Sequence, residues 1–286
     1  MNPLQALREF GQSVWLDYIR RGLITSGELQ RLVEDDGLRG ITSNPAIFEK
    51  AITGSTDYAE ALARLEQRRD LDAKSRYEQL AIRDIQDAAD VLLPVYTQTK
   101  RRDGFVSIEV SPLLARDAQA TLEEARRLWR LVARDNVMIK VPATTAGVVA
   151  FGQLIAEGMN VNVTLLFSRQ VYEQVALAYM AGLEALVARG GDPSRVSSIA
   201  SFFISRIDTA IDAILSARLK SATHAGEEAL LRSLLGKVAI ANGKLAYQRY
   251  KEMFRSDRWQ PLASKGAHTQ RACGPARAPR TRTTAT

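Results

Sequence analysis

Short runs of apolar and β-branched residues alternate with longer amphipathic segments through most of this 286-residue chain. The short runs predict β-strands, and the longer segments, whose apolar residues recur every three or four positions, predict helices. This alternation predicts parallel strands joined by crossover helices, in either a doubly wound sheet or a (β/α) barrel. The expected strands are residues 13–17, 38–43, 105–111, 137–143, 159–167 and 196–204, and the expected helices are a segment opening at Thr25 and residues 73–97, 113–134, 145–157, 168–190, 204–220 and 224–255.

Two features of the strands favour the barrel. The glycine-rich loops of nucleotide-binding folds, G-x-G-x-x-G and G-x-x-x-x-G-K-[ST], do not occur in the chain. Nearly every strand ends in a polar residue, and barrel enzymes carry their chemistry at the carboxyl ends of the strands. Strand alternation puts such residues on one face, so a single lumen would collect them. We therefore predict an α/β fold of the (β/α)8 TIM-type barrel class, with polar strand ends at Asp17, Ser43, Asn44, Glu109, Lys140, Asn162, Thr164 and Ser201.

The composition disfavours several classes of protein. With 46% hydrophobic and 25% charged residues, the chain is typical of a globular protein. It has no apolar run of about 18 residues, so we expect no transmembrane helix, and its first residues lack the layout of a secretion signal. A single cysteine excludes an internal disulfide framework. The two histidines, His224 and His268, leave little basis for a histidine metal site or a Ser-His-Asp triad.

The net charge of +7 arises at the end of the chain. Six Lys and Arg and no acidic residue lie from Arg258 onward, whereas residues 1–257 carry 33 basic and 32 acidic residues. A basic tail can bind nucleic acid, but this one has no aromatic residue beyond Trp259 to stack on bases. The balanced body therefore argues against nucleic acid as a partner.

Lys140 is the most informative residue because it interrupts the apolar strand VMIKVPA. Burying an ammonium group is costly, so its proton tends to leave and the neutral amine becomes a nucleophile. Such an amine condenses with a ketone or aldehyde to a Schiff base, which is an electron sink for carbon–carbon cleavage. The alternative is a lysine that pairs with a carboxylate or reaches water from the strand end.

Asp17 and Glu109 end two other strands and are the acid/base candidates. Schiff-base chemistry needs proton transfers when the carbinolamine forms, when the carbon–carbon bond breaks and when the product leaves. The alternative interpretation is a structural ion pair of either carboxylate with Lys140. The sequence alone leaves both the catalytic and the structural interpretation open.

Five segments occur in order along the chain: GITSNPAIFEKAI (40–52), VSIEVSP (106–112), NVMIKVPAT (136–144), NVNVTLLFS (160–168) and SFFISRID (201–208). Together they resemble the transaldolase family, in the longer bacterial type that also occurs fused to a glucose-6-phosphate isomerase. The resemblance implies a cytoplasmic enzyme that needs no metal or organic cofactor. It implies transfer of a dihydroxyacetone unit from sedoheptulose 7-phosphate to glyceraldehyde 3-phosphate in the non-oxidative pentose phosphate pathway. We expect sugar phosphates as partners, no nucleic acid or membrane, and a monomer or homodimer.

The same resemblance implies roles for the catalytic candidates. Lys140 matches the Schiff-base lysine, and Asp17 matches the acid/base that acts on the donor C4 hydroxyl. Glu109 matches the carboxylate that assists imine formation and hydrolysis through a water, with Thr164 near that water.

Four further positions match substrate-binding residues of the family. Asn44 and Asn162 match amides that hold the dihydroxyacetone hydroxyls, and Ser201 and Arg206 match positions that face the sugar phosphate. The planar fork of arginine suits phosphate oxygens. Local explanations exist as well: Arg206 could bond to Asp208 or to solvent, and an asparagine before a proline favours a turn.

The end of the chain departs from the family pattern. Residues 258–286 show no apolar periodicity, so we expect a barrel domain over residues 1–257, with strands 1–6 but not 7–8, and a disordered basic tail. Another reading frame over Ala272–Thr286 permits a sequence resembling the family's strand-7 segment, which suggests a frameshift near Arg271. This hypothesis leaves Cys273 without a function and predicts a truncated product of low solubility or low activity.

Three other functions remain open. The chain could be another Schiff-base aldolase, which cleaves a sugar phosphate without transferring the fragment. It could be a non-catalytic truncated product or scaffold, or a nucleic-acid binder acting through its tail. Dependence on an acceptor aldose identifies the transferase, and steep salt dependence identifies the nucleic-acid binder.

Overall fold

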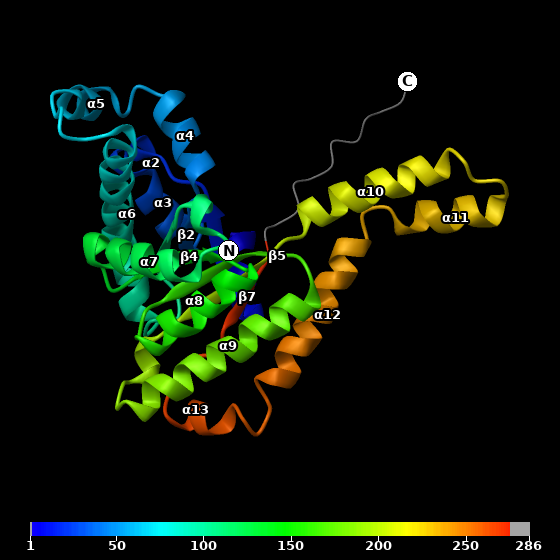
Figure 1. Cartoon of the computed structure of the whole chain (residues 1–286). Coiled ribbons are helices and arrows are strands. Elements are labelled where there is room, and N and C mark those ends of the chain that lie inside the picture. Colours follow the sequence, from blue (N-terminus) through cyan, green and yellow to red (C-terminus); the bar gives the residue numbers. More distant parts are fainter. Residues whose placement is uncertain (1, 275–286) are drawn as a thin grey trace.

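The computed structural model describes residues 2–274, and its centre is a sheet of seven parallel strands that follow one another in sequence order. The sheet curls into an incomplete (β/α) barrel with helices on its outside (Figure 1). Six of the strands lie within the ranges that the sequence predicts. The strands are β1 (Val14–Asp17), β2 (Leu38–Thr42), β3 (Phe105–Glu109), β4 (Val137–Pro142), β5 (Val161–Leu166), β6 (Ser198–Phe202) and β7 (Arg271–Cys273).

The helices agree with the sequence pattern where that pattern is long. The segments predicted over 73–97 and 168–190 form α6 and α9, and the helix that opens after Thr25 is α3. No helix in the described part of the chain is long and apolar enough to cross a membrane. The helices are α1 (Pro3–Ala6), α2 (Arg21–Thr25), α3 (Glu28–Asp35), α4 (Pro45–Thr53), α5 (Ala59–Glu66), α6 (Ala73–Gln98), α7 (Ala118–Val132), α8 (Thr145–Ala156), α9 (Arg169–Ala188), α10 (Ser205–Leu219), α11 (Ala225–Leu234), α12 (Val238–Met253) and α13 (Gln260–Ser264).

The helix prediction was wrong in several places: one predicted helix is divided in two, and the short helices α1, α2, α4, α5 and α13 were not predicted. The single helix expected over 224–255 is divided into α11 and α12, because Gly236 between them adopts a left-handed conformation with φ of 68°. The helix α4 was missed, although Asn44 caps it by accepting a hydrogen bond from Ile47 N and a proline occupies its first turn. This cap places the start of α4 directly after β2.

The prediction of six strands was also wrong, because β7 continues the sheet beside β6. Its register pairs Ile199 with Arg271 and Ser201 with Cys273. Three residues without a β-branched side chain carry no strand signal, so only the tertiary context reveals β7. Trp259 and Leu262 are buried, so residues 258–274 pack on the barrel, whereas residues 275–286 of the expected tail lie outside the described residues.

The barrel interior is divided into an apolar and a polar layer. Trp15, Phe105, Met138 and Ile199 pack together with the ring of Tyr96. The residues two positions further along β1, β3, β4 and β6 are polar, as the alternation of side chains predicts. The polar layer therefore faces the end of the barrel where the strands terminate.

Arg271 links the two edges of the sheet. β1 and β7 are the outer strands, and the described residues show no strand pairing between them. The Arg271 guanidinium donates to Ser13 Oγ at 2.6 Å, next to β1, and forms an ion pair with Asp103. One side chain thus spans the gap that a closed barrel would fill with backbone hydrogen bonds.

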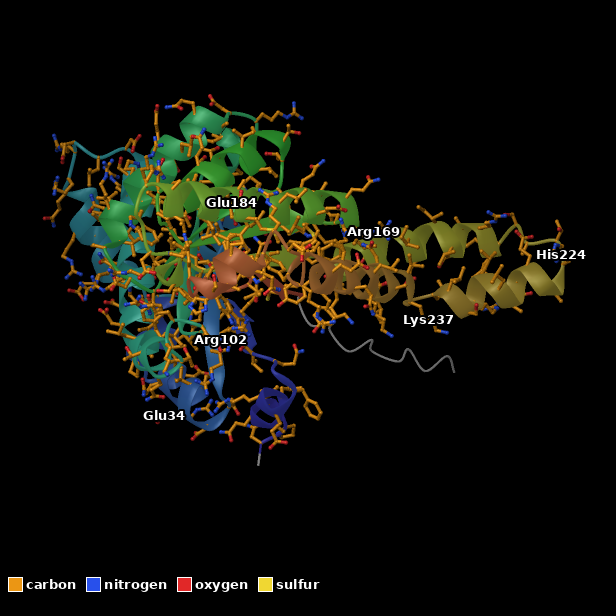
Figure 2. All side chains as sticks on the ribbon, turned by 90° about the horizontal axis from the view of Figure 1, so that it is seen from below. Glu34, Arg102, Arg169, Glu184, His224 and Lys237 are labelled. Carbon is orange, nitrogen blue, oxygen red and sulfur yellow. The ribbon has the colours of Figure 1, made fainter. Side chains whose placement is uncertain are left out.

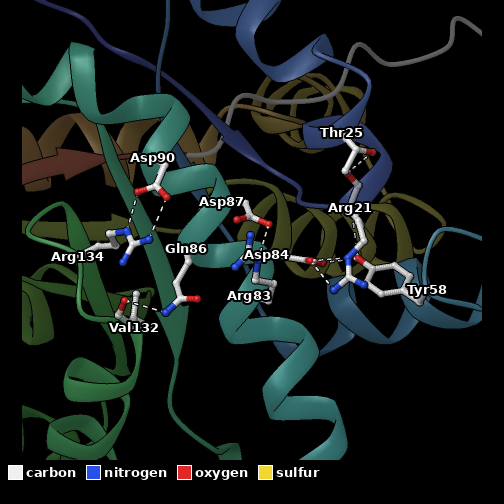
Figure 3. Close-up of polar contacts among 10 residues, drawn as sticks. All are labelled: Arg21, Thr25, Tyr58, Arg83, Asp84, Gln86, Asp87, Asp90, Val132 and Arg134. Carbon is white, nitrogen blue, oxygen red and sulfur yellow. Dashed lines mark hydrogen bonds and ion pairs between the residues drawn. The ribbon is translucent and has the colours of Figure 1, made fainter. Parts of the chain in front are cut away.

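A buried cluster holds α2 against α6 (Figure 3). Arg21 Nε donates to Asp84 Oδ1 at 2.8 Å, and the Tyr58 hydroxyl donates to Asp84 Oδ2 at 2.7 Å. The Arg21 guanidinium also lies 4.7 Å from the centre of the Tyr58 ring. Because α2 begins four residues after the end of β1, this cluster restrains the segment that leads away from Asp17.

The helices α10 and α11 form a hairpin that projects from the barrel, with His224 at its tip (Figures 1 and 2). Ile214 and Leu230 in this hairpin are largely exposed. The first turn of α10, at the base of the hairpin, contains Arg206. This turn borders a cavity at the end of the barrel where the strands terminate.

Candidate active site

A cavity of about 300 Å³ opens where the strands end. It collects six residues that the sequence assigns to the site, from four strands and from the starts of α4 and α10. Its wall consists of the predicted residues Asp17, Asn44, Glu109, Lys140, Thr164 and Arg206, together with Ala46, Ile47, Lys50, Leu165 and Phe203.

Lys140 lies inside the barrel and reaches the floor of this cavity. Lys140 is 6% exposed. It belongs to β4, in which every residue is buried. Its Nζ donates to the Ser43 carbonyl at 3.1 Å and lies 3.4 Å from Glu109 Oε2. The Ser43 hydroxyl in turn donates to the Ser107 carbonyl at 2.7 Å. This bond holds Ser43 in place, and with it the Ser43 carbonyl that accepts from Lys140. The amine is therefore held in place by one neutral acceptor and one carboxylate.

Glu109 is the carboxylate of this pair. Burial raises its pKa above the usual value for glutamic acid, and the positive charge of Lys140 opposes that rise. The ion pair that one interpretation of the sequence proposed is therefore present. It does not exclude chemistry, because a carboxyl group with a raised pKa is a suitable acceptor for the proton of a neighbouring ammonium.

Asp17 lies at the end of β1 and is held by a neighbouring strand. Thr42 Oγ1 donates to its Oδ1 at 2.5 Å, and the described residues include no ion pair between Asp17 and Lys140. The two carboxylates therefore differ in their surroundings: the Glu109 side chain is 14% exposed and lies beside the amine, and Asp17 is exposed at the cavity wall.

A chain of hydrogen bonds lies beside Lys140 in the polar layer. Asn162 is fully buried, is the register partner of Lys140, and donates from Nδ2 to Ser107 Oγ at 3.1 Å. Ser201 Oγ donates to Asn162 Oδ1 at 2.8 Å. Asn162 and Ser201 thus contact each other rather than line the main cavity wall, whereas Thr164 is buried and does line it.

Asn44 and Arg206 sit at the starts of two helices. The Asn44 side-chain oxygen is occupied as the cap of α4, so its Nδ2 is the group left for a ligand. Arg206 lies over the Phe203 ring, 4.8 Å from its centre, and has no ion pair among the described residues. Asp208, the alternative partner of Arg206, accepts a hydrogen bond from Ala239 N at 3.3 Å.

Five cavity residues were not predicted from the sequence: Ala46, Ile47, Lys50, Leu165 and Phe203. Lys50 lies on the unpredicted helix α4, and Phe203 follows β6. Leu165 adopts φ of 61°, which is rare for a leucine, at an irregularity in the pairing of β5 with β6. Such a bulge redirects side chains at the cavity wall, and nothing in the local sequence marks it.

The described residues contain no group of three or more His, Cys, Asp or Glu side chains arranged to hold a metal ion. What the cavity does present is two lysine amines, two carboxylates, one amide and an arginine. A barrel with a buried lysine beside a carboxylate at this end has the arrangement of enzymes that form Schiff bases with carbonyl substrates.

The comparisons with known proteins agree with this class. Residues 14–272 match the family model described as transaldolase/fructose-6-phosphate aldolase, and the chain belongs to this family. It is 51% identical over 272 residues to transaldolase 2 of Nostoc sp. PCC 7120, covering 95% of this chain and 71% of that protein. It is 48% identical over 271 residues to a transaldolase of Trichodesmium erythraeum, at 94% and 71% coverage. A transaldolase of Thiobacillus denitrificans is 47% identical over 270 residues, at 94% and 73% coverage.

Proposed function

We propose that this transaldolase-family enzyme transfers a dihydroxyacetone unit from sedoheptulose 7-phosphate to glyceraldehyde 3-phosphate through a Schiff base on Lys140. The observation that carries the proposal is the position of Lys140 Nζ, buried and 3.4 Å from Glu109 Oε2, in a cavity also lined by Asp17. A cytoplasmic location and a place in pentose phosphate metabolism belong to the same proposal.

The first half of the reaction uses the amine as an electron sink. Neutral Lys140 attacks C2 of the ketose, and loss of water from the carbinolamine gives an iminium ion. Asp17 takes the proton from the C4 hydroxyl, the C3–C4 bond breaks, and its electrons neutralise the iminium to an enamine. Erythrose 4-phosphate leaves as the free aldehyde.

The second half reverses these steps on the acceptor. The enamine carbon attacks C1 of glyceraldehyde 3-phosphate, and Asp17 returns its proton to the new hydroxyl oxygen. Water then hydrolyses the imine and releases fructose 6-phosphate. We assign to Glu109 the proton transfers at imine formation and hydrolysis, through a water held near Thr164, because its raised pKa suits a group that both accepts and gives a proton.

The remaining polar residues orient the substrate in this proposal. Asn44 offers its Nδ2 to a hydroxyl of the dihydroxyacetone unit. Asn162 is fixed by Ser107 and Ser201, so its amide is held in one orientation beside the reacting carbon. Arg206, with no ion-pair partner among the described residues, pairs with the phosphate.

Borohydride reduction tests the central step. The full chain is treated with fructose 6-phosphate and borohydride, and its peptides are mapped by mass. We expect a dihydroxyacetone or hexose adduct on Lys140, and none in a Lys140→Met variant treated in the same way. Folded protein without an adduct, or with an adduct on another lysine, contradicts the proposal and favours the non-catalytic interpretation.

A second candidate is an aldolase without an acceptor, because the matching family is named for both transaldolase and fructose-6-phosphate aldolase. Turnover of fructose 6-phosphate is measured with and without an aldose phosphate acceptor. A transferase requires the acceptor for efficient turnover, whereas an aldolase releases free dihydroxyacetone without it. Measuring soluble yield and turnover of the same preparation also tests the inactive-product interpretation.

A further inference from the structure

Lys50 enters the active-site cavity from the unpredicted helix α4. Three residues of this helix, Ala46, Ile47 and Lys50, line the cavity, and their spacing of three and four positions places them on one helix face. Glu49, the neighbouring carboxylate on α4, is not among the residues that line the cavity. Lys50 therefore contributes a charge to the cavity from the same helix whose cap is Asn44.

The Lys50 ammonium has no ion pair among the described residues. The other lysine of the cavity, Lys140, is engaged by Glu109 and by the Ser43 carbonyl. Arg206 also has no ion pair among the described residues, because its contact is with the ring of Phe203 rather than with a carboxylate. Two unpaired cations thus lie on the wall of one cavity, from two different helices.

The net charge of the cavity wall shows what the two cations can bind. Lys140 and Glu109 neutralise each other as a pair, and Asp17 opposes one of the two remaining cations. A sugar phosphate brings a charge of about −2 at neutral pH. Arg206 alone would leave the wall neutral overall, whereas Lys50 and Arg206 together leave it positive, as a dianionic ligand requires.

We propose that Lys50 is a second phosphate-binding residue, which acts with Arg206 and sets the preference of the cavity for phosphorylated sugars. This inference rests on the proposed function and adds a specificity residue to it. Arginine supplies a planar fork for two phosphate oxygens, and lysine supplies a compact charge on a flexible stem. The flexible stem suits an enzyme whose phosphorylated substrates differ in length, because the phosphate then lies at different distances from the reacting carbon.

The kinetic test compares a phosphorylated and an unphosphorylated donor. For Lys50→Met we expect the KM for fructose 6-phosphate to rise about tenfold, with the KM for fructose changed less than about twofold. Lys50→Arg keeps the charge and should restore most of the affinity. Lys220→Met, an exposed lysine at the end of α10, is the matched control and should leave both KM values unchanged. Equal effects on the two donors, or no effect on either, overturn the assignment.

Equilibrium binding separates this inference from the proposed reaction. Inorganic phosphate is titrated into wild type, Lys50→Met and Lys220→Met by calorimetry, which needs no turnover. We expect Kd to rise about tenfold only in Lys50→Met, while borohydride trapping of dihydroxyacetone on Lys140 continues as in wild type. Phosphate binding that is absent in wild type, or equal in all three proteins, overturns the role of Lys50. Failure of trapping in wild type contradicts the reaction and leaves the phosphate measurement to decide on Lys50.

Discussion

Glu109 and Lys140 form an ion pair that a structural and a catalytic interpretation would both produce, so the surroundings of the pair decide between them. A purely structural pair has no reason to border a cavity. This pair lies on the wall of a cavity of about 300 Å³, with Asp17 on the same wall. The raised pKa of Glu109 also lowers the cost of moving a proton between the two groups.

The pH dependence of Glu109→Gln tests this at the residue scale. Burial raises the pKa of Glu109, and the carboxylate must be ionised to accept a proton, so wild-type activity should fall at a higher pH than for an exposed glutamate, with its pKa of about 4.3. The variant should lose about 100-fold in kcat and also lose that acidic limb. Profiles of kcat/KM from pH 4 to 9 check the prediction. An unchanged acidic limb in the variant would assign it to another group.

The sequence predicted the position of single residues where strand alternation decides the direction of their side chains. Asp17, Glu109 and Lys140 end strands whose other inward residues are apolar or small, so their meeting in one lumen follows from a period of two. Lys50 depends on a helix that was not predicted, and the left-handed Leu165 depends on a bulge with no local signal. The bulge at Leu165 is set by tertiary packing, whereas α4 carried a local signal, the Asn44 cap followed by a proline, that the interpretation of the sequence did not use.

At the scale of elements, the cluster of Arg21, Tyr58 and Asp84 joins three segments that are distant in sequence. The side chain of Asp84 is 1% exposed and that of Arg21 is 19% exposed, so the pair is largely removed from water. Removing one partner leaves a buried charge without compensation. The cluster therefore stabilises the contact between α2 and α6, and with it the segment that follows Asp17.

Denaturation of Asp84→Ala tests this element-scale contact. We expect a loss of about 3 kcal/mol in the free energy of unfolding, and about 1 kcal/mol for Tyr58→Phe, which removes one hydrogen bond. The control is Arg83→Ala on the same helix, whose pair with Asp87 is 68% and 31% exposed and should contribute less than about 1 kcal/mol (Figure 3). Similar losses in Asp84→Ala and the control would show that the cluster is not a stabilising link.

Elements were predictable in proportion to their length and to the regularity of their pattern. The prediction of α6 over 73–97 is confirmed by Ala73–Gln98, because a long amphipathic period leaves little ambiguity. β7 was not predictable, since Arg271–Cys273 contains no strand-forming residue and is ordered by its neighbours. The break between α11 and α12 covers residues 235–237, and its glycine does not by itself mark the end of a helix in a helical pattern.

For the whole molecule, the main question is how a sheet with two outer strands keeps its curvature. In the described residues β1 and β7 share no backbone hydrogen bonds; Arg271 bonds to Ser13 next to β1, and Trp15 and Cys273 pack on one buried apolar cluster. Its partners are partly buried, with the Asp103 side chain 13% exposed. A charge-assisted contact of this kind is stronger than a surface ion pair, so Arg271 is expected to contribute to holding the two edges together.

Hydrogen exchange on Arg271→Met tests that dependence. The substitution keeps an apolar stem but removes the bonds to Ser13 and Asp103, so we expect a loss of about 2 kcal/mol in stability. Exchange should accelerate most for amides in β1 and β7, because those strands lose a polar link between them, and less in the central strand β4. Arg258→Met, which breaks the exposed pair with Glu184, is the control and should change neither region by more than about twofold. Uniform acceleration over β1, β4 and β7 would mean that the edges are held by the sheet as a whole, and that the guanidinium contributes only to global stability.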